Sequence, residues 1–195
     1  MGVVMGSAFY RLTEIVVAMT ALIVFVPLLC FVIVLIKAGS RGPAILCQTR
    51  LGRGRIPFKL FKLRTMSVET LTVPTHLVND ASITPLGRVL RRYRIDELPQ
   101  LLNVIIGDMS LVGPRPCLPT QLDIINAREI MGVFVVRPGM TGLAQISNVD
   151  MSDPGRLSGI DATYVSTRSA ARDLKILFHT VTGMGIDRRI TNRGG

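Results

Sequence analysis

The sequence predicts a small α/β domain that is attached to a membrane by an N-terminal apolar helix. Three observations lead to this class. Residues 15–36 contain no charged side chain and are long enough to cross a bilayer. Residues 45–50 and 58–63 are short, nearly alternating apolar segments on either side of a glycine turn. The later part of the chain repeats apolar residues at helical spacing. We therefore divide the chain into a membrane-inserted segment, 1–40, and one cytoplasmic domain, 41–195.

The apolar stretch 15–36 is too long for the core of a signal peptide, and Lys37 and Arg41 follow it in place of a cleavage site. Pro27 lies near its middle, where it removes a backbone donor and clashes with the preceding turn. The segment could span the bilayer as a kinked helix. It could also dip into one leaflet and return to the same face. Sequence physics alone leaves both topologies open.

The distribution of basic residues orients the anchor. Arg11 is the sole basic residue before the apolar stretch, whereas no acidic residue occurs from 37 to 64. The positive-inside rule therefore places the body of the protein in the cytoplasm. Cys30, Cys47 and Cys117 have no spacing typical of a disulfide or zinc site, which agrees with a reducing compartment. The basic residues after the stretch are Lys37, Arg41, Arg50, Arg53, Arg55, Lys59, Lys62 and Arg64.

The net charge of +10 requires an anionic partner. Most of the positive charge is arginine, which favours bidentate recognition of phosphate. Nucleic acid is disfavoured because the chain has no tryptophan, few aromatic residues and no basic helix free of apolar side chains. Anionic lipid head groups and a phosphorylated substrate fit the apolar anchor better.

The first elements of the domain are a hairpin and a basic helix. Gly52-Arg53-Gly54 supplies the turn between the segments 45–50 and 58–63. Residues 86–93 have a helical pattern that places three arginines on one face. On its own such a face is typical of a solvated surface. These arginines are Arg88, Arg91 and Arg92.

Two adjacent carboxylates, Asp96 and Glu97, precede a second predicted helix that ends at Gly107. Asp96 falls at or near the N-cap, with Glu97 and Pro99 in the first turn. One interpretation is that the pair simply caps the helix. The other is a phosphate-handling site, in which one carboxylate holds a divalent cation and the other attacks phosphorus. The apolar face of this helix contains Leu98, Leu101, Leu102 and Ile105.

Two later loops each display an arginine, Arg115 between prolines in 113–116 and Arg137 in 137–142. The polar segment 67–83 is predicted to be a loop, and the tail after residue 187 is basic. A C-terminal amphipathic helix either packs on the core, which we favour, or lies on the membrane surface. Its apolar residues are Leu174, Leu177, Phe178 and Val181.

Several long motifs in one order make the chain similar to the bacterial sugar transferase family, the monotopic phosphoglycosyl transferases that begin glycoconjugate assembly, such as exopolysaccharide assembly, on a polyprenyl-phosphate carrier. The resemblance runs from the apolar segment to about residue 180. The motifs are Gly42-Pro43 with Gln48, Thr49, Arg50 and Gly52; Phe61-Lys62-Leu63-Arg64-Thr65-Met66; Ile83-Thr84-Pro85-Leu86-Gly87-Arg88; Asp-Glu-Leu-Pro-Gln-Leu from Asp96; Gly-Asp-Met-Ser-Leu-Val-Gly-Pro-Arg-Pro from Gly107; and Arg137-Pro138-Gly139.

The resemblance implies a two-step reaction. Asp96 would attack the β-phosphate of a UDP-sugar and release UMP, Glu97 would help to hold Mg²⁺, and polyprenyl phosphate would then accept the phosphosugar. It also implies a re-entrant helix broken near Pro27, at the cytoplasmic face of a bacterial inner membrane. Val26 stands where members often have Ser, which puts the angle of the break in question. The implied substrate-binding residues are Lys62, Arg91 and Arg115 near phosphates, Arg64 and Arg137 toward the nucleotide, and Arg88.

A competing function is a non-catalytic membrane anchor or regulator of a glycan assembly complex. It would explain the basic surface and the apolar segment, but it makes no use of Asp96 and Glu97. The apolar segment and the C-terminal helix are the two surfaces through which a homodimer could form.

Overall fold

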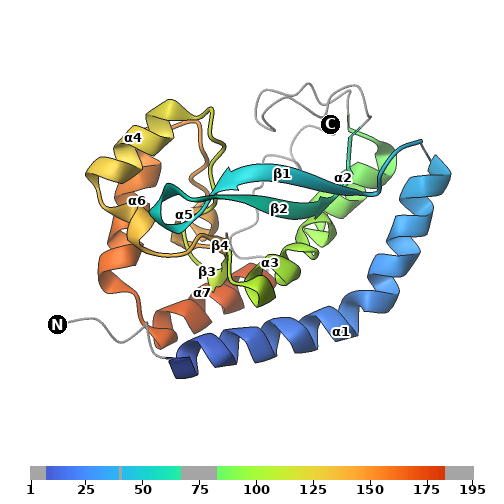
Figure 1. Cartoon of the computed structure of the whole chain (residues 1–195), viewed down its shortest axis with the longest axis horizontal. Helices are drawn as coiled ribbons and strands as arrows, with labels where there is room; N and C mark the ends of the chain where they lie inside the picture. Colours follow the sequence, from blue (N-terminus) through green and yellow to red (C-terminus); the bar gives the residue numbers. More distant parts are fainter. Residues whose placement is uncertain (1–7, 40, 67–82, 183–195) are drawn as a thin grey trace.

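The computed structural model describes residues 8–39, 41–66 and 83–182. A long helix, α1 (Ala8–Gly39), runs along one side of the molecule, and a β-hairpin and a set of shorter helices lie on its inner side (Figure 1). The mixed α/β class, the hairpin and the N-terminal apolar helix are confirmed. Most of the predicted polar loop and the whole basic tail lie outside the described residues. The division at residue 40 stays a prediction.

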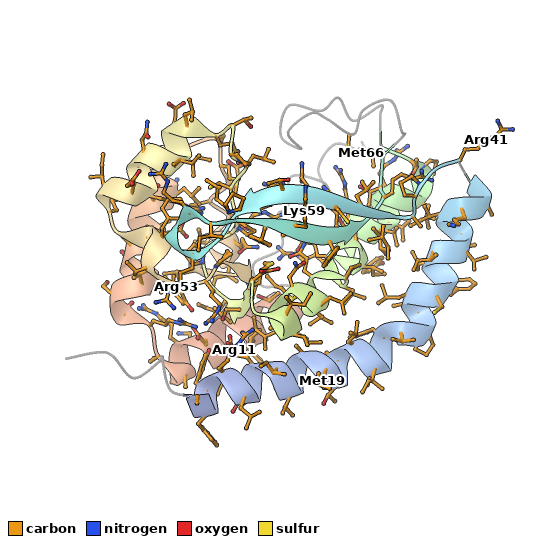
Figure 2. All side chains as sticks on the ribbon, in the orientation of Figure 1. Arg11, Met19, Arg41, Arg53, Lys59 and Met66 are labelled. Carbon is orange, nitrogen blue, oxygen red and sulfur yellow. The ribbon has the colours of Figure 1, made fainter. Side chains whose placement is uncertain are left out.

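Helix α1 is continuous through Pro27 but bends partway along its length (Figure 1). Proline lacks the N–H that would bond to the preceding turn, so Pro27 is the expected cause of the bend. The helix is long and apolar enough to cross a membrane by length and composition. Side chains on its outer side, such as Met19, point away from the protein (Figure 2). An exposed apolar surface of this kind favours a membrane anchor.

The inner side of α1 packs on two core clusters, one for each half of the helix. Ala18 lies with Leu101 and Val104 in the first cluster. Val32 and Ile36 lie in the second, with Leu29 and residues of the hairpin and the next helix. Each half of the bent helix is therefore fixed against the domain.

The hairpin consists of β1 (Ile45–Leu51) and β2 (Pro57–Leu63), paired antiparallel with Ile45 opposite Leu63 and Leu51 opposite Pro57. A short 3₁₀ turn, η1 (Arg53–Arg55), joins the strands, and Gly54 takes a positive φ of 64° in it. Glycine adopts this conformation without the penalty that a side chain imposes. The hairpin prediction is confirmed, with ends within one residue of those expected.

Helix α2 (Pro85–Arg92) begins at Thr84, whose hydroxyl accepts a hydrogen bond from the N–H of Gly87 at 2.9 Å. Gly87 lies directly against the backbone of Thr65, because a Cβ built on it would come within 2.0 Å of the Thr65 carbonyl oxygen. Glycine at this position allows α2 to lie against the end of β2. The basic face of α2 is thereby brought beside the hairpin.

Two turns follow α2. Arg94 takes a left-handed conformation with φ of 55°, and η4 (Ile95–Glu97) is a 3₁₀ turn. Helix α3 (Gln100–Ile106) starts after Pro99, its N-cap, and ends at Gly107 with φ of 112°. The predicted end at Gly107 is confirmed. The predicted N-cap at Asp96 is wrong, because the two carboxylates lie on a separate 3₁₀ turn that precedes α3, and Pro99 is the N-cap.

The rest of the domain surrounds a small parallel pair, β3 (Ser110–Val112) and β4 (Gly139–Thr141). The connection between these strands contains α4 (Leu122–Ile130) and a 3₁₀ turn, η5 (Val133–Val135). Three helices follow: α5 (Leu143–Ile146), α6 (Pro154–Thr167) and α7 (Ala170–Thr182).

Helix α7 is amphipathic, but its buried face matches the predicted apolar face only in part. Ile176 is buried and Leu177 packs beside it in the core. Leu174, Phe178 and Val181 are exposed. The expected core packing is therefore confirmed for Leu177 but not for the other three residues of the predicted apolar face, and the alternative location on the membrane surface stays a prediction.

Candidate active site

Asp96 and Glu97 lie on η4, where apolar neighbours fix the backbone. Ile95 and Leu98 on either side of them pack against the core cluster formed by α1, the hairpin and α2. The N–H of Glu97 donates to the carbonyl of Arg94 at 3.1 Å, which closes the turn. Both carboxylates are half-buried. The pair therefore stands at the edge of the core, partly shielded from water.

Glu97 forms an ion pair with Arg115. The Nη2 atom of Arg115 lies 2.8 Å from Oε1 of Glu97. Burial by itself raises the pKa of Glu97, but the positive charges of Arg115 and Arg94 outweigh it and hold the pKa below its ordinary value. Glu97 is consequently a fixed negative charge at neutral pH.

Asp96 behaves in the opposite way. Burial, followed by repulsion from Glu97, raises the pKa of Asp96 to about 6, although Arg91 and Lys62 act against this rise. Adjacent carboxylates whose pKa values move apart are typical of sites in which the two groups have different roles. Asp96 is the carboxylate whose charge changes close to neutral pH.

Lys62 and Arg91 supply positive charge from two other elements. Lys62 lies on β2, and burial, together with the neighbouring Arg50 and Arg91, lowers its pKa to about 8. Arg91 lies in the last turn of α2, and its Nε donates to the hydroxyl of Thr65 at 2.9 Å. The hairpin, α2 and the segment after β3 therefore place cations around one carboxylate pair.

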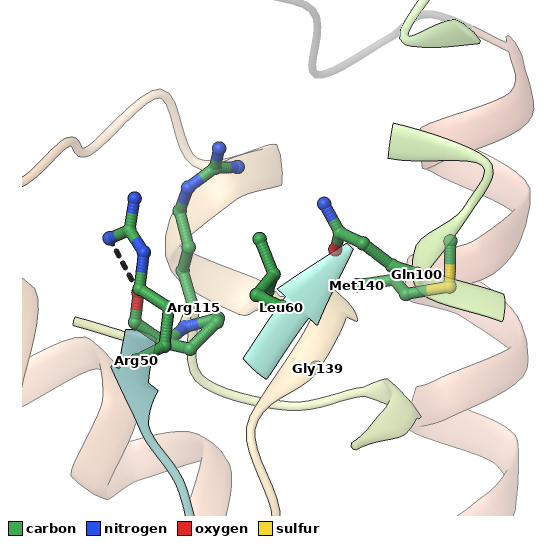
Figure 3. A pocket seen from close by; sticks show the side chains of 7 residues that line it. Arg50, Leu60, Gln100, Arg115, Gly139 and Met140 are labelled. Carbon is green, nitrogen blue, oxygen red and sulfur yellow. Dashed lines mark hydrogen bonds between the residues drawn. The ribbon is translucent and has the colours of Figure 1, made fainter. Parts of the chain in front are cut away.

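Arg50 belongs to the same site, although sequence reasoning did not select it. It lines a small, open pocket together with Arg115 and Gln100. The guanidinium groups of Arg50 and Arg115 point the same way from its wall (Figure 3). Burial, and then the charge of Arg115, lowers the pKa of Arg50 to about 10. Two guanidinium groups that point the same way from one wall form a receptor suited to a phosphate or diphosphate.

Arg94 was also missed, and its position two residues before Asp96 in the sequence was the available signal. For Arg50 the signal was its place in the motif with Gln48 and Gly52. The Nη2 of Arg50 donates to Oε1 of Gln48 at 2.8 Å, and its Nη1 donates to the carbonyl of Pro116 at 3.2 Å. The second bond joins residues that are 66 positions apart, which no local pattern reveals.

Three predicted substrate-binding arginines are not among the charges that act most strongly on Asp96 or Glu97. Arg64 is buried, and it donates to the carbonyls of Ile36 at the end of α1 and of Arg41. Arg137 donates through Nε to the carbonyl of Gly107 at 2.8 Å, at the end of α3. Arg88 is exposed on α2. Their roles toward substrate stay predictions.

The donor set of Asp96 and Glu97 fits a magnesium ion. Across residues 8–39, 41–66 and 83–182, no group of three or more His, Cys, Asp or Glu side chains could hold a metal by itself. Mg²⁺ is commonly held by one or two carboxylates and completed by substrate phosphates and water. The pair is therefore compatible with a metal that binds together with a phosphorylated substrate.

A family model described as "Bacterial sugar transferase" matches residues 5–186. The chain belongs to the bacterial sugar transferase family. The resemblance drawn from the motifs is thereby confirmed, and nearly the whole of this sugar transferase falls within the match.

Curated relatives agree with this assignment. The chain is 42% identical over 185 residues to a UDP-glucose:undecaprenyl-phosphate glucose-1-phosphate transferase of Caulobacter vibrioides, across 89% of this chain and 68% of the relative. It is 38% identical to a UDP-N-acetylgalactosamine-undecaprenyl-phosphate N-acetylgalactosaminephosphotransferase of Aeromonas hydrophila, across 88% and 43%. It is 37% identical to the exopolysaccharide production protein PSS of Rhizobium leguminosarum bv. phaseoli, across 91% and 95%. This sugar transferase thus spans nearly all of one relative and under half of another.

Proposed function

We propose that this sugar transferase moves a sugar 1-phosphate from a UDP-sugar to a polyprenyl phosphate, with undecaprenyl phosphate as the expected carrier, and releases UMP. The observation that carries this proposal is the pair Asp96 and Glu97, whose pKa values are shifted in opposite directions and which is surrounded by cations from three elements. Two relatives whose names state this type of reaction on undecaprenyl phosphate support it.

In the first step, the Asp96 carboxylate attacks the β-phosphorus of the donor. A bond forms between phosphorus and the Asp96 oxygen, the bond to the bridging oxygen breaks, and UMP leaves with that oxygen. Asp96 is ionised above pH about 6, so it is available as a nucleophile at neutral pH. Lys62, Arg91 and Arg115 would neutralise the charge on the transferring group and on the departing phosphate.

In the second step, a phosphate oxygen of the polyprenyl carrier attacks the phosphorus of the aspartyl phosphosugar. The bond to Asp96 breaks, which regenerates the carboxylate and leaves the sugar on a polyprenyl diphosphate. Glu97 would hold Mg²⁺, which, when bound, would supply positive charge at the diphosphate. Its pair with Arg115 keeps Glu97 anionic for that purpose.

The test of this function is UMP release from a panel of UDP-sugars, with and without Mg²⁺ and polyprenyl phosphate, by protein in nanodiscs. UDP-glucose and UDP-N-acetylgalactosamine head the panel because relatives' names include them. We expect metal-dependent release of UMP from one donor. Folded protein that releases none with any donor and acceptor would favour the non-catalytic anchor or regulator instead.

The reaction should have a bell-shaped dependence of kcat/KM on pH. Protonation of Asp96 removes the nucleophile, so the rate falls as the pH drops below about 6. Loss of the proton from Lys62 removes a phosphate-binding charge, so the rate falls again above pH about 8. A pH series checks both limbs. Lys62→Arg should convert the basic limb into a plateau, whereas a profile that is flat from pH 5 to about 9 would contradict these roles.

We also propose that α1 is re-entrant, with both ends on the cytoplasmic face of a bacterial inner membrane. The bend of α1 and the packing of both its halves on the same domain support this topology. Single cysteines at positions 5 and 40, in a variant without the three native cysteines, should react with an impermeant reagent in inverted vesicles but not in spheroplasts. Labelling of the two positions from opposite sides would mean that α1 spans the bilayer.

All groups named in the two steps come from one chain. The proposed chemistry therefore does not require the homodimer that the sequence leaves open.

A further inference from the structure

A buried ion pair lies behind the loop that carries Arg115. Arg128 on α4 donates through Nε and Nη2 to Oδ2 of Asp161 on α6, at 3.0 and 2.7 Å. Each side chain is 2% exposed. Among the ion pairs of residues 8–39, 41–66 and 83–182, it is the one in which neither side chain reaches 5% exposure.

A buried ion pair stabilises the contact between two helices poorly. Removing two charges from water costs several kcal/mol, which their attraction only partly returns, and apolar residues of similar size often stabilise a fold better. The pair therefore calls for an explanation beyond packing. Arg128 offers one, because its Nη1 donates to the main-chain carbonyl of Arg115 at 2.7 Å.

The same loop is held at each carbonyl from 114 to 117. The N–H of Gly139 on β4 donates to Pro114 at 2.9 Å, and the N–H of Leu51 on β1 donates to Cys117 at 3.0 Å. The two central carbonyls, those of Arg115 and Pro116, receive arginine side chains, Arg128 and Arg50. Hence the main chain beneath the Arg115 side chain is fixed by a group whose own orientation depends on Asp161.

We propose that the Arg128–Asp161 pair positions Arg115, fixing its main chain so that its guanidinium meets Glu97 and the phosphate of the donor. Asp161 orients the guanidinium of Arg128, and Arg128 in turn holds the Arg115 carbonyl. Neither residue of the pair touches the reacting atoms in this proposal, so both are positioning residues. The assignment rests on the proposed function, in which Arg115 neutralises charge on the transferring phosphate.

The test replaces the pair by apolar residues of similar volume, Arg128→Met with Asp161→Leu, which preserves packing while it removes the donor to Arg115. We expect a folded protein whose kcat falls about 10- to 100-fold while KM for the donor changes little, because a looser Arg115 loses contacts made in the transition state. The acid limb of the pH profile should move to higher pH, because a displaced Arg115 lowers the pKa values of the two carboxylates less. Arg128→Lys should lose less activity than the double variant, since an ammonium group can still donate to the carbonyl of Arg115.

The control is Arg55→Met, which breaks the exposed pair with Glu129, the neighbour of Arg128 on α4, and should leave the rate and the pH profile unchanged. If the double variant folds with a wild-type rate and pH profile, the proposal is overturned. A second measurement, NMR titration of the Glu97 carboxyl, does not depend on turnover. A raised Glu97 pKa in the double variant supports the positioning role even if the wild type releases no UMP. If the wild type is active and the double variant shows no such rise, the positioning role is rejected and the proposed function stands.

Discussion

Asp96→Asn should abolish UMP release, with a loss on the order of 10⁴-fold or more, because an amide cannot form the bond to phosphorus that the reaction needs. The substitution should leave the fold intact. Burial and Glu97 raise the pKa of Asp96 to about 6 in the folded chain, above its value of 3.8 when unfolded. An acid with a raised folded pKa costs stability as the pH rises through that interval. A neutral amide of the same shape should therefore keep or raise the thermal midpoint at pH 7.5.

A matched control separates this effect from a general change in charge. Asp123→Asn removes an exposed carboxylate from the first turn of α4 and should retain the wild-type rate. Full UMP release by Asp96→Asn, with the control also active, would exclude Asp96 as the nucleophile. A loss of activity that accompanies a fall in the thermal midpoint would instead point to a structural role.

Arg115→Met should reduce kcat/KM by about 10²- to 10³-fold, the usual effect of removing one positioned donor from a developing anion. It removes the partner 2.8 Å from Glu97 and one of the two guanidinium groups that line the pocket with Gln100. Both carboxylates then bind protons more readily, so the acid limb of the pH profile should also move to higher pH. Initial rates across a pH series measure both effects.

The exposed pair of Arg55 with Glu129 gives the comparison for Arg115. It is as short, at 2.7 Å, but both its side chains are about half exposed. Arg55→Met should change neither rate nor pH profile, because exposed pairs contribute little. Equal effects of the two substitutions would mean that the loss of an arginine, and not the Arg115 site, determines the result.

Local patterns predicted the elements whose causes are local. The alternation on either side of Gly54 predicts the hairpin, and Gly107 predicts the end of α3. The start of α3 was wrong because an aspartate before an apolar helix looks like an N-cap, whereas Pro99 takes that position. The left-handed Arg94 and the 3₁₀ turn arise from packing of Ile95 and Leu98 on distant elements, which a single segment does not encode.

The site was predicted only in part for the same reason. Adjacent carboxylates stand out in a sequence, as does an arginine between prolines. The structural roles of buried arginines do not stand out. In the sequence Arg64 is one of several basic residues near the predicted hairpin, and its hydrogen bond to the end of α1 exists only in the folded chain. Arg50 and Arg128 likewise donate to carbonyls 66 and 13 positions away in the chain, beyond the reach of a local pattern. Such contacts depend on tertiary structure, which residue spacing alone does not specify.

The most direct test of the two-step account is the intact mass of the protein after incubation with its UDP-sugar and Mg²⁺ but without lipid acceptor. We predict an added phosphosugar on the wild-type chain, located at Asp96 by peptide mapping, absent from Asp96→Asn and removed when polyprenyl phosphate is supplied. Active enzyme that carries no adduct, and releases UMP only when the acceptor is present, would contradict the covalent intermediate and indicate direct transfer from donor to lipid.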